Sequence, residues 1–167
     1  MRTVCFIAAL VLSVSVMPSW AEDAAPAKEA AVSMNDKKVT NEEGKEITIG
    51  SLQGTKGLVI FQYPKADTPG CTKESCGFSN EFEKYKTAGY GVAGISHDTP
   101  EAQKAFHDKF KMVITLIADP SGELGKALGL EPMKRQTAIL DASGKVTKVI
   151  KEVKAAEHPT ELIKDLQ

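Results

Sequence analysis

Short runs of apolar residues alternate with segments of helical periodicity along most of this chain, and this alternation limits the folds open to it. The runs at 57–63 and 90–96 have the length of buried strands. The first is followed by Phe78, Phe82 and Tyr85, whose spacing places them on one face of a helix. Strands that alternate with helices predict an α/β fold with helices on both faces of the sheet.

Turn sequences predict a β-hairpin at each end of this pattern. The N-terminal hairpin has its turn at 41–44 and the C-terminal hairpin has its turn at 141–144. Because the last strands are antiparallel, we expect a mixed central sheet, as in the thioredoxin-like fold and in several other small α/β folds. The remaining predicted elements are strands at 39–40, 46–49, 113–118, 137–140 and 146–153, helices at 72–86, 122–128 and 160–166, and a helix that begins at Pro100.

The first 21 residues have the layout of a secretory signal peptide. Arg2 precedes an apolar run at 4–16, and small residues stand before the expected cleavage site at Glu22. This run is short for a membrane span, which needs about 20 residues. The uncharged stretch extends over 3–21, so an uncleaved anchor is the alternative. We expect export, to a bacterial periplasm, with no stable membrane association after cleavage.

The mature chain divides into a linker and one domain. Residues 22–36 are alanine-rich with a central proline and are interpreted as a flexible linker, so the domain covers 37–167. The chain has 21 basic and 22 acidic residues and no block of like charge, which argues against nucleic-acid binding. Its three cysteines are too few for a disulfide scaffold or a four-thiolate zinc site, and cleavage would remove Cys5.

The two remaining cysteines stand where the first long strand ends and a helix begins, the usual place for a site in an open α/β sheet. Cys71 falls in the first turn of the predicted helix, where free N–H groups and the helix dipole favour a thiolate. Thr68 is close enough to line the same pocket, and Pro64 stiffens the loop. The histidines, at 97, 107 and 158, are scattered and are interpreted as surface or loop residues.

The spacing of Cys71 and Cys76 is unfavourable for a disulfide on an intact helix. Five residues of helix separate the two Cα atoms by about 8 to 9 Å, whereas a disulfide rarely tolerates more than about 7 Å. Bonding therefore requires the first turns to unwind, which indicates a redox switch or a catalytic cycle. The alternative is a structural disulfide, which an exported protein can use, although so small a loop would stabilise it little.

The segment 63–78, YPKADTPGCTKESCGF, resembles peroxiredoxins of the Q type, also called the bacterioferritin-comigratory group. The motif PxxxTxxC is met by Pro64, Thr68 and Cys71. The similarity covers about 125 residues and includes the stretch 119–129 and Arg135 before a late strand. The resemblance implies the thioredoxin-like fold and a thiol peroxidase that needs no metal or organic cofactor.

In that family the equivalent of Cys71 attacks a hydroperoxide and becomes a sulfenic acid, and the resemblance makes Cys76 the resolving cysteine of an intramolecular disulfide. An external thiol donor, thioredoxin-like or another, would then reduce this disulfide. An intramolecular pair needs no second subunit, so we expect a monomer.

The resemblance also assigns roles to the residues around the thiol. Thr68 would hydrogen-bond the peroxide, Pro64 would shield the sulfenate, and Arg135 would stabilise the thiolate and the leaving oxygen. Glu74 matches a position that orients this arginine, and the alternative is a carboxylate on the helix surface. The chain departs from the family pattern in its polar first strand and in a short loop at 130–134.

Two other functions remain open from the residues alone. A thiol–disulfide oxidoreductase would typically carry its cysteines as CxxC, a motif that this sequence lacks. A non-enzymatic domain would use the pair as a structural disulfide.

Overall fold

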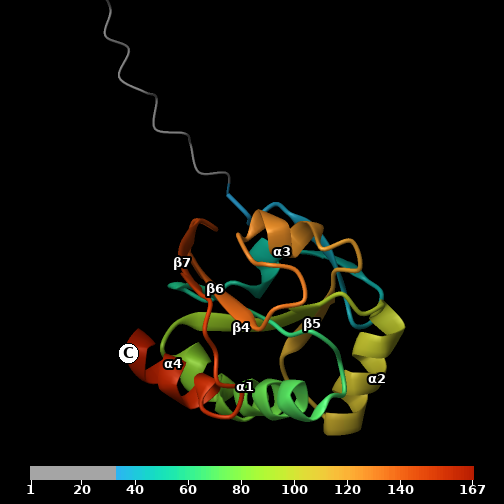
Figure 1. The fold of residues 1–167 in the computed structure, drawn as a ribbon. Coiled ribbons are helices and arrows are strands. Elements are labelled where there is room, and N and C mark those ends of the chain that lie inside the picture. The colour runs from blue at the N-terminus through green and yellow to red at the C-terminus, as the bar shows by residue number, and fades with distance from the viewer. Residues whose placement is uncertain (1–32) are drawn as a thin grey trace, which may run out of the picture. The chain divides into compact units, whose positions relative to one another are not determined.

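A seven-stranded mixed sheet runs through residues 33–167, the part of the chain that the computed structural model describes (Figure 1). The strand order is β2-β1-β5-β4-β3-β6-β7. The pairs β3/β4 and β4/β5 are parallel, whereas the other neighbouring strands are antiparallel. The strands are β1 (Lys38–Asn41), β2 (Glu46–Thr48), β3 (Gly57–Gln62), β4 (Tyr90–Ser96), β5 (Thr115–Ala118), β6 (Gln136–Asp141) and β7 (Val146–Ile150).

Helices cover both faces of this sheet, as the sequence predicts. Figure 1 shows α1, α2 and α4 on one side of the sheet and α3 on the other. Two separate clusters of buried apolar side chains fill the spaces between sheet and helices. The helices are the 3-10 helix η1 (Ile49–Leu52) and the α-helices α1 (Pro69–Thr87), α2 (Pro100–Phe110), α3 (Glu123–Ala127) and α4 (His158–Leu166).

Strand β3 lies between β4 and β6 in the interior of the sheet, and this position accounts for its nearly continuous apolar sequence. Leu58 and Ile60 point to the face covered by α3, whereas Val59 and Phe61 point to the face covered by α1. A strand that is buried on both faces reads as an unbroken apolar run rather than as an alternating one.

The predicted helices and strands are present, and they differ from the prediction mainly in the residues at which they begin and end. Helix α1 begins at Pro69, three residues before the predicted start, because proline is favourable in the first turn and Thr68 is still extended. Composition predicts that Met34 belongs to the linker, but it is buried in the core and its N–H donates to the carbonyl of Gly144. The predicted signal peptide lies outside the described residues. Among residues 33–167, no helix is long and apolar enough to cross a membrane.

Candidate active site

The loop between β3 and α1 is held in a defined conformation by α2 and the end of β4. The N–H of Ala66 donates to Asp98 Oδ2 at 2.7 Å, and Lys109 Nζ of α2 contacts the Asp67 carboxylate at 2.6 Å. Asp67 has a φ of +56°, a left-handed conformation that aspartate tolerates better than most side chains. These contacts fix the loop that carries the predicted residues Pro64 and Thr68.

Thr68 ends this loop at the N-cap of α1, and Pro64 stands half-buried near its beginning. The Thr68 hydroxyl donates to the carbonyl of Lys65 at 3.1 Å. Its side chain makes no capping bond to the helix, and the hydroxyl oxygen can still accept a hydrogen bond from a bound molecule.

Cys71 lies in the first turn of α1, as predicted, and its side chain is 2% exposed. Arg135, which comes directly before β6, reaches this thiol: Nη2 donates to Cys71 Sγ at 3.3 Å. The guanidinium passes close over Gly70, where a Cβ would lie 3.2 Å from Nη2. A small residue before the cysteine therefore allows the arginine to approach the sulfur.

Glu74, one turn further along α1, is completely buried and bonds Arg135 through Nη1 and Oε2. Its other oxygen, Oε1, has no hydrogen-bond partner. Burial raises the pKa of Glu74 to about 7, and the charge and hydrogen bond of Arg135 offset this only in part. For the less buried Arg135, desolvation is outweighed by the carboxylate and by Cys71, so its pKa is raised.

Cys76 is half-buried on the same helix, and both cysteines are free thiols in this structure. Burial raises the pKa of the Cys76 thiol. Both residues lie within continuous α-helix, as the sequence analysis expects, so the estimated separation of about 8 to 9 Å applies to the two Cα atoms.

Beyond Cys76, helix α1 packs tightly against α4. Gly77 leaves no room for a side chain, since a Cβ there would lie 2.8 Å from Pro159 Cγ. The Tyr85 hydroxyl donates to the carbonyl of Pro159 at 2.7 Å, and Phe78 stacks on Phe61 with the ring centroids 4.3 Å apart. The part of α1 from Gly77 onward is thus anchored to the sheet and to α4.

His158 is a correction to the sequence analysis, which placed it at the surface. His158 is the first residue of α4, and its side chain is buried, with Nε2 2.8 Å from Thr137 Oγ1 and its ring edge-on to Phe78. Burial, together with the nearby charge of Arg135, lowers the pKa of His158 to about 4. The local sequence does not predict this burial, because the apolar neighbours Pro159 and Leu162 would also be compatible with an exposed histidine.

The fold and the position of Cys71 define the class: a thioredoxin-like α/β protein with a buried thiol at the start of a helix beside an arginine. Comparison with known families is more specific. Residues 23–149 match the AhpC/TSA family. The chain belongs to that family, and its resemblance to the Q-type peroxiredoxins is confirmed by the relatives described next.

The sequence is 36% identical over 134 residues to the chloroplastic peroxiredoxin Q of Sedum lineare, covering 76% of this chain and 72% of that protein. It is 49% identical over 96 residues to peroxiredoxin bcp1 of Schizosaccharomyces pombe, covering 58% of this chain. The match spans about half the length of that second protein (49%).

Solved structures agree with the predicted thioredoxin-like fold. Peroxidoxin BcpB of Mycobacterium tuberculosis superposes with a TM-score of 0.72 at 27% identity, over 81% of this chain and 94% of that chain. The bacterioferritin comigratory protein of Xanthomonas campestris gives 0.73 at 26% identity, over 80% and 91%.

Proposed function

We propose that this protein is a thiol peroxidase that reduces hydrogen peroxide and organic hydroperoxides through Cys71. The observation that carries the proposal is the contact between Arg135 Nη2 and Cys71 Sγ, which places a fixed positive charge at a buried thiol. The family of the chain supports it. The similar Xanthomonas campestris protein is described as having alkyl peroxide reduction activity.

In the first step, the Cys71 thiolate attacks the distal oxygen of the peroxide. A sulfur–oxygen bond forms, the oxygen–oxygen bond breaks, and the departing oxygen takes a proton to leave as water or an alcohol. Cys71 becomes a sulfenic acid. Arg135 stabilises both the thiolate and the charge that develops on the leaving oxygen, while the Thr68 hydroxyl binds the peroxide and Pro64 restricts access by water.

In the second step, the Cys76 thiolate attacks the sulfenic sulfur of Cys71. The sulfur–sulfur bond forms, the sulfur–oxygen bond breaks, and the departing hydroxide takes a proton to leave as water. Two electrons from an external thiol donor, thioredoxin-like or another, then restore both thiols as the donor becomes a disulfide. Because the cysteines are about 8 to 9 Å apart on the helix, the first turns of α1 unwind for this step.

The segment between the cysteines is built to unwind more readily than the rest of α1. Glu74 Oε1 and Ser75 Oγ are both buried without hydrogen-bond partners, and each such atom costs stability that exposure to water would return. The helix from Gly77 onward carries the anchoring contacts with Pro159 and Phe61. Unwinding that stops at Gly77 would bring the two sulfurs together and leave the contacts of Gly77 and Phe78 in place.

The compartment and assembly state form part of the proposal. The N-terminal 21 residues would direct export and be removed before Glu22, and the enzyme would work as a monomer that receives electrons from a thiol donor on that side of the membrane. Mass spectrometry of the protein from the exporting cell tests the cleavage site, and sedimentation tests the monomer.

Peroxide consumption by the wild type, Cys71→Ser and Cys76→Ser, with a thiol reductant, tests the peroxidase. We expect no consumption by Cys71→Ser, and a sulfenic acid that can be trapped in Cys76→Ser. Equal and negligible consumption by all three proteins would refute the peroxidase and leave the structural disulfide. Exchange with protein disulfides in the absence of peroxide reduction would favour the oxidoreductase.

A further inference from the structure

Two buried glutamines lie side by side beneath the loop that leads to Arg135. Gln62 is the last residue of β3 and Gln136 the first of β6, and the two are direct partners in the antiparallel register. Gln62 and Gln136 are 1% and 3% exposed. Buried amides in such a place need hydrogen-bond partners, and these partners show what the amides hold.

Both side chains bond the loop 131–134. Gln62 Nε2 donates to the carbonyl oxygens of Glu131 at 2.6 Å and of Lys134 at 2.9 Å. Gln136 Oε1 accepts from the N–H of Glu131 at 2.8 Å, and Gln136 Nε2 donates to the Glu131 carboxylate at 3.2 Å. On its other side, Gln62 rests on α3, because a Cβ at Gly125 would lie 2.7 Å from Gln62 Oε1.

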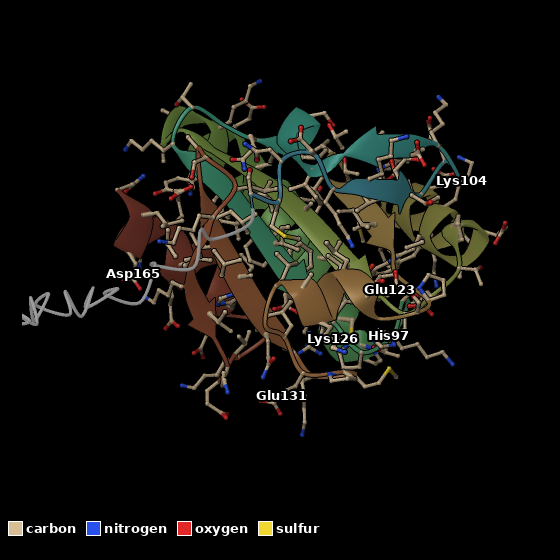
Figure 2. All side chains as sticks on the ribbon, turned by 90° about the horizontal axis from the view of Figure 1, so that it is seen from above. His97, Lys104, Glu123, Lys126, Glu131 and Asp165 are labelled. Carbon is tan, nitrogen blue, oxygen red and sulfur yellow. The ribbon has the colours of Figure 1, made fainter. Side chains whose placement is uncertain are left out.

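The outer side of this loop is exposed and carries one solvent-exposed ion pair, between Lys151 Nζ and Glu131 Oε1 at 3.5 Å. Met133 is 53% exposed and has a φ of +58°, a conformation that is unfavourable for its side chain. Figure 2 shows Glu131 at the outer margin of the molecule. The two glutamines therefore hold the loop from within, and its last residue, Lys134, is bonded to Gln62 directly before Arg135.

We propose that Gln62 and Gln136 are positioning residues that fix Arg135 at Cys71 from the side of the sheet. The inference rests on the proposed peroxidase function. The other anchor of the guanidinium is Glu74, which belongs to the segment of α1 that unwinds during resolution. If Glu74 alone held Arg135, the guanidinium would move away from its position in every catalytic cycle. If the β3/β6 pair also holds it, the guanidinium stays at the position to which the Cys71 thiolate returns.

The test is Gln62→Met, which keeps the length of the side chain and removes both hydrogen bonds. The rate constants for reaction of Cys71 with hydrogen peroxide and with iodoacetamide are measured in the reduced protein. Iodoacetamide has no oxygen leaving group, so the peroxide rate depends more on the placement of Arg135. We expect the ratio of the peroxide rate to the iodoacetamide rate to fall about tenfold.

A double-mutant cycle separates positioning from general damage. In an Arg135→Ala background, Gln62→Met should cause no further fall in the ratio, since its target is absent. Gln53→Met is the matched control, because its amide bonds Asn35 instead of the loop 131–134. We expect the control to keep the wild-type ratio.

An unchanged ratio in Gln62→Met, or an equal fall in the Arg135→Ala background, would overturn the positioning role. If Gln62→Met does not fold, as judged by circular dichroism, Gln136→Met takes its place under the same criteria. A wild-type Cys71 that does not react with peroxide would refute the proposed function and the positioning role together. A reactive wild type with an unchanged Gln62→Met refutes the positioning role alone.

Discussion

Replacing Glu74 by glutamine should remove a pH dependence from the stability of the first turns of α1. In the intact helix the carboxyl is fully buried, and this burial raises its pKa to about 7. In the unwound segment the carboxyl reaches water and regains a pKa near its ordinary value of 4.5. The intact helix therefore binds this proton more strongly than the unwound form does.

The sign follows from this difference. Below pH 4.5, Glu74 is protonated in both forms and the intact helix has its full stability. Between pH 4.5 and about 7 the unwound form loses the proton first, so the stability of the intact helix falls as the pH rises. Above this range both forms are ionised and the loss is complete. The difference between the pKa of Glu74 in the intact helix and in the unwound form corresponds to about 3 kcal/mol, which changes the unwinding equilibrium by a factor of more than about 100.

Hydrogen exchange of the reduced protein measures this equilibrium. Protection of the amides at 72–76, corrected for the intrinsic exchange rate, should fall by about 100-fold between pH 4.5 and pH 7.5 in the wild type. The amides at 78–87 provide an internal reference. Glu74→Gln should show no such fall, because the amide stays neutral, and the variant retains the neighbouring charge of Arg135.

Two results would refute the reasoning. If the wild type and Glu74→Gln have the same protection at both pH values, then Glu74 does not change its ionisation when α1 unwinds. If protection in the wild type rises with pH, then the ion pair with Arg135 stabilises the carboxylate more than burial destabilises it. In that case the pKa of Glu74 lies below its ordinary value.

Three further substitutions have expected outcomes that the contacts define. Ser75→Ala removes a buried hydroxyl without a partner, so it should raise the melting temperature by a few degrees and prolong the lifetime of the Cys71 sulfenic acid; a lower melting temperature would contradict this. Gly77→Ala places a Cβ 2.8 Å from Pro159 Cγ and should lower the free energy of unfolding in urea by about 1 kcal/mol; unchanged stability would mean that α1 and α4 separate freely. Asp98→Ala removes the acceptor of the Ala66 N–H and should slow the reaction with peroxide at unchanged secondary structure; an unaffected rate would show that the loop holds its shape alone.

The elements of this fold were predictable because each depends on local signals. The apolar run at 57–63 became β3, and the run at 90–96 became β4 with the predicted bounds. The turns at 41–44 and 141–144 connect the predicted hairpins. Element ends were less accurate, since the final strand stops at Ile150 and not at 153. Tertiary packing determines where a helix or strand ends, and the local sequence pattern does not show that packing.

The neighbours of the thiol were not predictable from local pattern. Arg135 lies 64 residues from Cys71, and only family resemblance singled it out. The burial of Glu74 and of His158 depends on how α1, α4 and the sheet meet. Gln62 did leave a signal, because a polar residue stood in a run interpreted as a buried strand. A buried amide of this kind predicts a hydrogen-bonded partner, although not which segment supplies it.

In the proposed cycle, the segment of α1 that carries the two cysteines moves, whereas the loop that carries Arg135 stays in place. Cys71, Glu74 and Cys76 belong to one helix, and in the proposed cycle they leave their places together when its first turns unwind. Arg135 directly precedes β6 and is tied to the sheet through a loop that no residue of α1 supports by a backbone hydrogen bond. In this proposal, Arg135 stabilises the charge that develops on the substrate, and the unwinding segment of α1 forms the bond between the sulfurs. When the disulfide is reduced and the helix re-forms, the thiol would therefore return to a guanidinium that is already in position, while the side chains of Glu74 and Ser75 would have to be buried again.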